Sequence, residues 1–218
     1  MSIVPPPKKL QSDATFNSTS SSADCEGRPR QQLDDGVGPL YHRSYTVVVE
    51  SSWAHALTVM RQFQSNLNDF SPKTMCRFEK TKGDEHALDT GDEFQIHITG
   101  PWNGPVRVAA SCETSFTLAT LEGHMEAGEI RFSIEPVTDT FVRFKVESFA
   151  KSKDAIVDFI YDKIPIAKFF QTEMWRSVCG SVAERLRAER NDGPTGEVFA
   201  VEVKTERRDE ETGQWMQM

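Results

Sequence analysis

The chain has 218 residues, with 25 Lys and Arg against 33 Asp and Glu and a formal net charge of −8. This length suits one domain with a substantial core. A negative net charge gives no positive field that would attract nucleic acid, so we expect no nucleic-acid partner. The first residues lack the apolar core of a signal peptide, and no later run approaches the roughly 20 apolar residues of a membrane span. We therefore expect a cytoplasmic protein with no integral membrane span.

The first 38 residues combine a proline run, Pro5–Pro7, with a serine-rich stretch and show no periodic apolar pattern. Such a segment cannot bury enough surface to offset the entropy lost on ordering. We predict that residues 1–38 form a disordered tail.

The region between the two tails is dominated by alternation of apolar and polar residues, which is typical of half-buried strands. Turn sequences such as Trp102-Asn103-Gly104 separate these segments, and links this short require antiparallel neighbours. The pattern predicts seven strands, at about 41–50, 75–81, 93–98, 106–112, 115–120, 129–134 and 142–147.

Two segments change to helical spacing. The first has a continuous apolar stripe formed by Trp53, Ala56, Leu57, Met60 and Phe63, with Ser51 or Ser52 as its cap. The second is longer, runs from about residue 153 to 188, and is expected to bend or divide at Pro165 because proline lacks a donor N–H.

This order of elements predicts an α+β fold of the helix-grip type, in which a seven-stranded antiparallel curved sheet wraps around a long C-terminal helix. We place the domain at residues 39–188. In such an arrangement the space between the concave face of the sheet and the helix often stays partly open, and a ligand would bind there.

The C-terminal stretch, 189–218, holds eight acidic residues and four basic ones and is expected to be a solvated acidic tail. Phe199, Val201 and Val203 alternate with other residues within it. This part could add an edge strand, on this chain or on the sheet of a partner. The second alternative would make the protein an interaction module and a possible homodimer.

One segment also resembles a known family. Residues 120–132, TLEGHMEAGEIRF, are similar to the G-T-L-P-G-H-P-E-x-G-E-E-R-F segment of the START-like family catalogued as domain of unknown function nineteen-ninety. Within this motif, the residues that depart from the family pattern are Ala119, Glu122, Met125 and Ile130. Weaker likeness extends from about Gly38 to Leu186. The resemblance implies a START-like fold but names no activity.

The chemistry-bearing candidates in that segment are His124 and Glu129, which flank a turn containing Gly128. A histidine with a carboxylate partner can act as a general base near neutral pH, so these two residues are the candidate catalytic pair of an enzyme. The alternative is that His124 only hydrogen-bonds the backbone of its own loop, and that Glu126 nearby is solvated.

The leading hypothesis is a binding module for a small apolar or amphipathic molecule. Its candidate ligand contacts are Trp102, Arg107, His124 and Phe169, although Trp102 and Phe169 could equally pack in the core.

No metal site is predicted, because the histidines show no ligand spacing with one another. The four cysteines form no C-x-x-C pair, and we interpret them as reduced thiols. Common phosphate-binding, dinucleotide and zinc-hydrolase motifs are missing, so no cofactor is expected. Cys112 lies on the apolar side of its predicted strand and should be a small buried residue.

Overall fold

A computed structural model of the chain describes residues 27–98, 104–153, 165–188, 200–209 and 212–218, with side chains of the last helix from residue 171 onward. The helices and strands are, in order, η1 (Leu33–Asp35), β1 (Val37–Glu50), α1 (Trp53–Ser65), η2 (Leu67–Asp69), β2 (Cys76–Lys82), β3 (Glu93–Ile98), β4 (Gly104–Cys112), β5 (Ser115–Thr120), β6 (Glu126–Pro136), β7 (Phe141–Ser152), α3 (Pro165–Arg187), β8 (Glu202–Arg208) and β9 (Trp215–Gln217).

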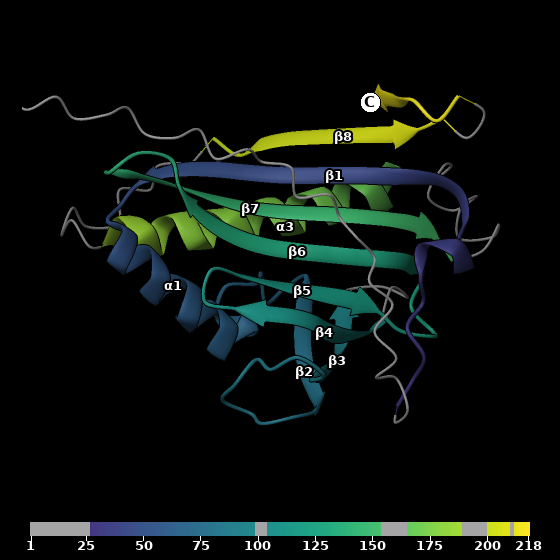
Figure 1. Cartoon of the computed structure of the whole chain (residues 1–218), viewed down its shortest axis with the longest axis horizontal. Helices are drawn as coiled ribbons and strands as arrows, with labels where there is room; N and C mark the ends of the chain where they lie inside the picture. Colours follow the sequence, from purple (N-terminus) through teal and green to yellow (C-terminus); the bar gives the residue numbers. More distant parts are fainter. Residues whose placement is uncertain (1–26, 99–103, 154–164, 189–199, 210–211) are drawn as a thin grey trace, which may run out of the picture.

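Within these described ranges the strands form one sheet of nine, in the order β2-β3-β4-β5-β6-β7-β1-β8-β9. Every neighbouring pair is antiparallel. The α+β class, the antiparallel curved sheet and the seven strands expected from alternation are confirmed as β1 to β7 (Figure 1). The predicted total of seven is too low, because β8 and β9 come from the acidic C-terminal stretch.

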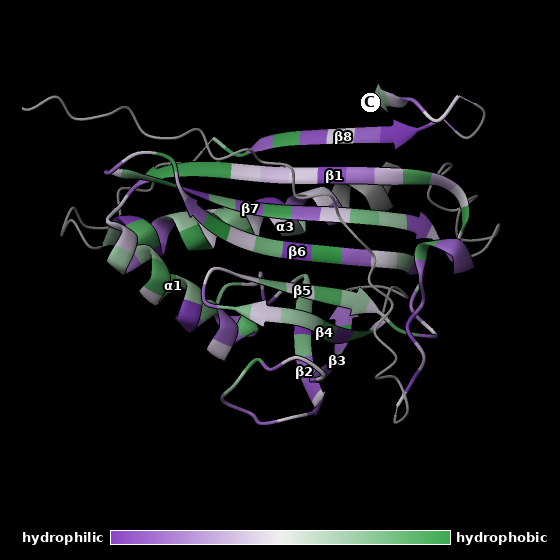
Figure 2. Ribbon diagram, viewed as in Figure 1, coloured by the Kyte–Doolittle hydropathy of each residue, from purple (hydrophilic) through white to green (hydrophobic). Residues whose placement is uncertain are grey.

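Strand β8 lies beside β1 of its own chain, with Tyr41 opposite Arg207 and Thr46 opposite Glu202. Val201 and Val203 pack against the core, while the other side of the strand carries charged residues, so β8 is largely hydrophilic in Figure 2. The described part of the acidic stretch is therefore sheet as well as solvated chain. Alternation alone left open whether this strand would pair within the chain.

Both predicted helices are present in the described chain. Ser52 caps α1 by accepting a hydrogen bond from the backbone N–H of His55 at 3.2 Å. Val59 is buried in the α1 interface, whereas Leu57 of the predicted stripe is only half-buried. Of the predicted helix at 153–188, residues 154–164 lie outside the described chain, so its bend is untested. No described helix is both long and apolar enough to cross a membrane.

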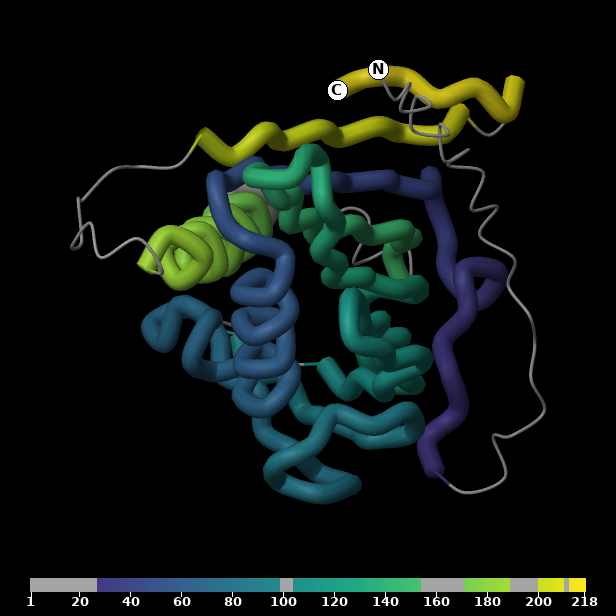
Figure 3. Tube along the Cα trace, turned by 60° about the vertical axis from the view of Figure 1, so that its left-hand side comes forward, coloured from purple at the N-terminus to yellow at the C-terminus, as the bar shows by residue number. Residues whose placement is uncertain are grey.

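The molecule has two layers, with α1 and α3 on one face of the sheet and residues 27–36 along the opposite face (Figure 3). We call these the inner and outer faces. The inner face holds the core, where Phe63 of α1 meets Phe116 and Phe132 of the sheet at centroid distances of 5.3 and 5.5 Å. Helix α3 contributes Val178 and Leu186 to the same core.

Residues 27–36 contact the sheet, which moves the start of the folded chain ahead of the predicted boundary at residue 38. Arg30 forms an ion pair with Glu129 of β6. The buried Gln31 donates from Nε2 to the carbonyl oxygens of His124 and Glu126, at 3.1 and 2.8 Å. Strand β1 already begins at Val37. The predicted disorder of residues 1–26 concerns residues outside the described chain.

A β-bulge in β4 overturns the prediction for Cys112. Val108 lies opposite Leu118, but Ala110 lies opposite Thr117, so Ala109 is an extra residue in β4. One extra residue reverses which face each later side chain takes. Cys112 is consequently exposed and not buried.

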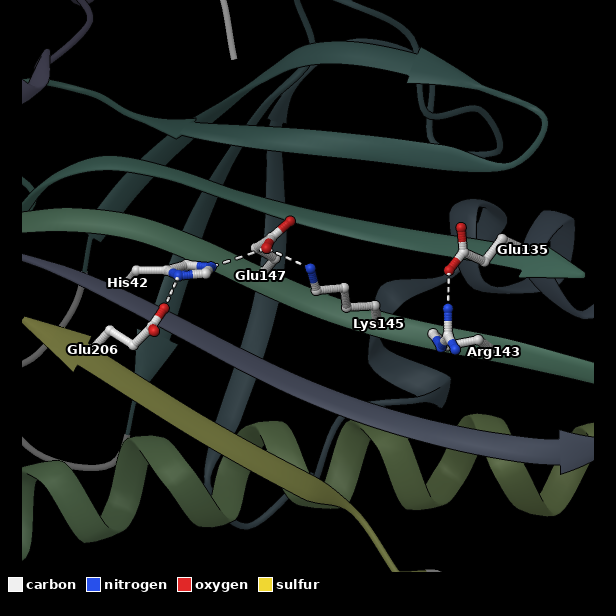
Figure 4. Close-up of polar contacts among 6 residues, drawn as sticks. All are labelled: His42, Glu135, Arg143, Lys145, Glu147 and Glu206. Carbon is white, nitrogen blue, oxygen red and sulfur yellow. Dashed lines mark hydrogen bonds and ion pairs between the residues drawn. The ribbon is translucent and has the colours of Figure 1, made fainter. Parts of the chain in front are cut away.

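The outer face carries a polar cluster that joins three strands (Figure 4). His42 of β1 lies between two carboxylates, with Nε2 2.9 Å from Glu147 of β7 and Nδ1 2.9 Å from Glu206 of β8. Its ring stacks on Phe149, with centroids 4.3 Å apart. The cluster thereby ties β8 to β1 and β7.

Candidate functional site

Inward-facing side chains become smaller along the central strands, away from α1. In β6 the inner face passes from Phe132 through Ile130 to Gly128, and in β7 it ends at Ser148 and Ala150. The register places Ile130 opposite Ser148 and Gly128 opposite Ala150, so the small residues lie side by side. Large side chains fill the space under α1, whereas the other end of the inner face is left partly empty.

This end contains a cavity of about 100 Å³ between the sheet and α3. Helix α3 closes it with Gln171, Met174 and Trp175. The sheet and the β5–β6 loop supply the other lining residues, which are Ile96, Ile98, Val106, Leu118, Thr120, His124, Met125, Glu126, Gly128, Glu129, Ile130, Ser148 and Ala150. Most of this lining is apolar, with a few polar groups gathered near the start of β6.

The main polar group inside the cavity is the carboxylate of Glu126, at the first residue of β6. Its Oε1 lies 3.4 Å from Nη1 of Arg43, and Gln171 approaches its two oxygens at 3.4 and 3.3 Å. The side chains of Arg43 and Glu126 are 9% and 16% exposed, so this is a largely buried ion pair. Sequence reasoning expected Glu126 to be solvated, and the structure corrects that expectation.

His124 lines the cavity from the loop before β6, and its ring is tied to its own loop. Its Nδ1 accepts the backbone N–H of Glu126 at 2.9 Å. Burial lowers the pKa of His124, which favours the neutral imidazole. The ring presses on Gly104, where an added Cβ would lie 2.0 Å from the ring carbon Cδ2. This is the backbone-bonded arrangement that the sequence left as the alternative.

Glu129 is held on the other face of the sheet, away from the imidazole. It pairs across the sheet with Ala119 and Phe149, and Phe149 stacks on the outer-face residue His42. Glu129 borders the cavity next to Gly128, but its carboxylate pairs with Arg30. Burial raises the pKa of Glu129, and the Arg30 charge opposes that shift. His124 bonds its own loop and Glu129 pairs with Arg30, so in the described chain no hydrogen bond joins the predicted acid–base pair, and a catalytic role for the two stays a prediction.

The other predicted ligand contacts have different outcomes. Arg107 follows the cavity-lining Val106 in β4 and so faces outward, where its guanidinium bonds Glu93 at 2.8 Å and the carbonyl oxygen of Arg28 at 2.8 Å. Arg107 is therefore not a lining residue. Trp102 and the side chain of Phe169 lie outside the described residues, and their roles stay predictions.

Sequence reasoning missed Glu126, Gly128, Ser148 and Ala150 as site residues. Their signal was present in the sequence, because small or polar residues occupy inward positions of strands whose other inward positions are large and apolar. In the part of the chain that the structure describes, no group of three or more His, Cys, Asp or Glu is placed to hold a metal ion.

With this geometry established, comparison with known proteins places the chain in a family. The model of the family described as domain of unknown function (DUF1990) matches residues 41–181, which is more than half of the chain. This protein belongs to the DUF1990 family. No curated protein matches it in sequence. Residues 27–36 and strands β8 and β9 lie outside the part that matches the DUF1990 model.

Several solved structures are similar to this DUF1990 protein in fold. The protein TTHA0849 from Thermus thermophilus is 8% identical, and the match covers 68% of this chain and 98% of that one with a TM-score of 0.50. The hypothetical protein jhp0584 from Helicobacter pylori is 12% identical, covering 66% and 86%, also with a TM-score of 0.50. A truncated norcoclaurine synthase from Thalictrum flavum is 15% identical, covering 68% and 97%, with a TM-score of 0.48. At such identities the likeness concerns the fold alone.

Proposed function

We propose that this DUF1990 protein binds a small apolar or amphipathic molecule in the cavity between the sheet and α3. The observation that carries the proposal is the decrease in side-chain size along the inner face, from Phe132 to Gly128 in β6 and from Phe144 to Ala150 in β7. A folded core normally fills such space, because empty volume in an interior forfeits packing contacts. A cavity built this way, with apolar walls and a few convergent polar groups, has the character of a ligand site.

The size of the cavity sets an upper limit of about one ring on a ligand that enters without moving the walls. An engineered apolar cavity of about 150 Å³ binds benzene, and the cavity here measures about 100 Å³. His124 keeps its place as a wall residue in this proposal, since its ring lines the cavity while its Nδ1 accepts a bond from the loop backbone.

The test is thermal unfolding of the purified protein with toluene or benzyl alcohol. A ligand that binds only the folded state raises the melting temperature by mass action, so we expect a dose-dependent rise for the natural chain. Ala150→Leu would fill the cavity from its wall and should abolish the response. Ala110→Leu makes the same change at an exposed strand position and should retain it.

An equal response of both variants would place the bound probe elsewhere. Absence of any response in the natural chain, to these probes and to longer apolar molecules alike, would overturn the proposed function.

A further inference from the structure

The polar end of the cavity has one acceptor that its neighbours only partly satisfy. Arg43 and Gln171 approach the Glu126 carboxylate at 3.3 to 3.4 Å, which is longer than the 2.7 to 2.9 Å of a good charge-assisted hydrogen bond. A carboxylate has about four lone-pair sites. Glu126 therefore retains acceptor capacity in a wall that is otherwise mostly apolar.

The charge at this end is internally compensated. Glu126 carries one negative charge beside one positive charge on Arg43, and His124 accepts a backbone N–H at Nδ1 while burial lowers its pKa, which favours the neutral ring. Arg43 lies below 10% exposure and sits over the Tyr41 ring at 4.9 Å, so packing holds its guanidinium in place. A charged ligand entering here would lose its hydration and meet a like charge next to each opposite one.

We propose that the cavity selects an uncharged ligand that carries a hydroxyl group, and that Glu126 accepts the hydrogen bond from it. This inference rests on the proposed function and specifies its ligand class. The apolar walls, among them Ile96, Leu118 and Trp175, take the ring or chain of the ligand. The hydroxyl points toward β6.

The experiment measures dissociation constants by titration calorimetry for four probes that share one ring: toluene, benzyl alcohol, benzoate and benzylammonium. A hydrogen bond to a charged acceptor corresponds to a gain of about tenfold or more in affinity. We expect the natural chain to bind benzyl alcohol about tenfold more tightly than toluene, and to bind both ions more weakly than benzyl alcohol.

Glu126→Gln tests the assigned acceptor, because it keeps the shape of the side chain and removes its charge. We expect this variant to lose most of the preference for benzyl alcohol over toluene. It should also gain affinity for benzoate, since Arg43 is then uncompensated.

Glu135→Gln is the matched control. Glu135 lies on the same strand and also pairs with an arginine, Arg143, at 2.6 Å, but on the outer face (Figure 4). It should keep the binding profile of the natural chain. Circular dichroism and the melting temperature of each variant establish that it is folded, and toluene binding provides a readout that does not need Glu126.

The outcomes separate the two proposals. If the natural chain binds none of the four probes and also gives no thermal response to longer apolar molecules, the proposed function itself is contradicted. Binding of toluene without a preference for benzyl alcohol, or tighter binding of either ion, contradicts only the hydroxyl selectivity. An unchanged preference in folded Glu126→Gln contradicts the assignment of Glu126 as the acceptor.

Discussion

At the scale of single residues, the protonation of His42 is expected to affect stability. Both ring nitrogens face carboxylate oxygens, which only accept, so both must carry a proton for both bonds to form. The hydrogen bond to Glu147 raises the pKa of His42, burial opposes this, and Glu206 adds to the rise. A raised pKa means that the stabilisation is complete below the unfolded value of about 6.5 and is lost as pH rises through the folded value.

The variant His42→Phe tests this pH-dependent stabilisation, because it keeps a ring stacked on Phe149 and removes both hydrogen bonds. We expect this variant to lose about 1 kcal/mol of unfolding free energy near pH 5.5, and the deficit to shrink by about pH 8. Urea denaturation at several pH values measures it. His97→Phe is the control, because the pair of His97 with Glu79 is more exposed. A deficit that does not change with pH would contradict the protonated state of His42.

The acidic limit of the same cluster comes from Glu147. Hydrogen bonds from His42 and Lys145 lower the pKa of Glu147 to about 2, from an ordinary value of 4.5. Its contribution is present above pH 4.5 and is lost as pH falls toward 2. The cluster is therefore most stabilising between the two limits, at mildly acidic pH.

Cys112 is a second residue whose chemistry follows from its position. A hydrogen bond with the Ser115 hydroxyl, at 3.3 Å, lowers the pKa of this exposed thiol to about 7. Burial raises the pKa of Cys76 to about 11 and that of Cys179 to about 12. Because the thiolate is the reactive form, Cys112 should react first of these three with iodoacetamide at neutral pH.

Peptide mapping by mass spectrometry after a short exposure measures this order and separates these sites from Cys25. Ser115→Ala should slow the labelling of Cys112 while leaving Cys76 and Cys179 unlabelled. Equal labelling of Cys179 in the folded protein would contradict its burial in the core.

At the scale of elements, β8 has one side that packs against the core and one side that carries charged residues. Val203 lies opposite Tyr45 and packs against the core, whereas Glu202 and Lys204 point away and pair with each other. We predict that Val203→Asp releases β8, because a carboxylate would replace an apolar side chain at a partly buried position. Limited trypsin digestion should then cut sooner at Lys204 and Arg207.

Glu202→Gln is the matched control for this experiment. It changes a charge on the exposed side of the strand, one residue away, and should leave the cleavage rate as it is in the natural chain. If Val203→Asp resists trypsin equally well, the apolar contacts of β8 do not hold the strand in place.

The elements also differ in how far local sequence predicts them. Strands β1 to β7 and helix α1 follow from periodicity and from the cap at Ser52, since both signals act within a few residues. The pairing of β8 with β1 does not, because a short alternating segment can add to either edge of a sheet or to another chain. Only the folded arrangement determines its partner.

At the scale of the whole molecule, the cavity results from register. Alternation in β6 predicts two faces, but the decrease in size matters only because Gly128 lies opposite Ala150 and Ile130 opposite Ser148. The closure by Gln171, Met174 and Trp175 depends on where α3 crosses the sheet, more than 20 residues later in the chain. A cavity of this kind is a property of several elements together.

The sequence by itself determined the α+β class, the seven antiparallel strands, helix α1, the described part of the second helix and the resemblance that the family match confirmed, because these depend on local periodicity and on a contiguous motif. Tertiary structure decided which way several side chains point and which partners they meet. The bulge at Ala109 turned Cys112 outward, the course of residues 27–36 made Arg30 the partner of Glu129, and the approach of Arg43 and Gln171 made Glu126 the polar group of the cavity. Each of these outcomes depends on contacts between different elements of the chain, and local sequence patterns carry no information about such contacts.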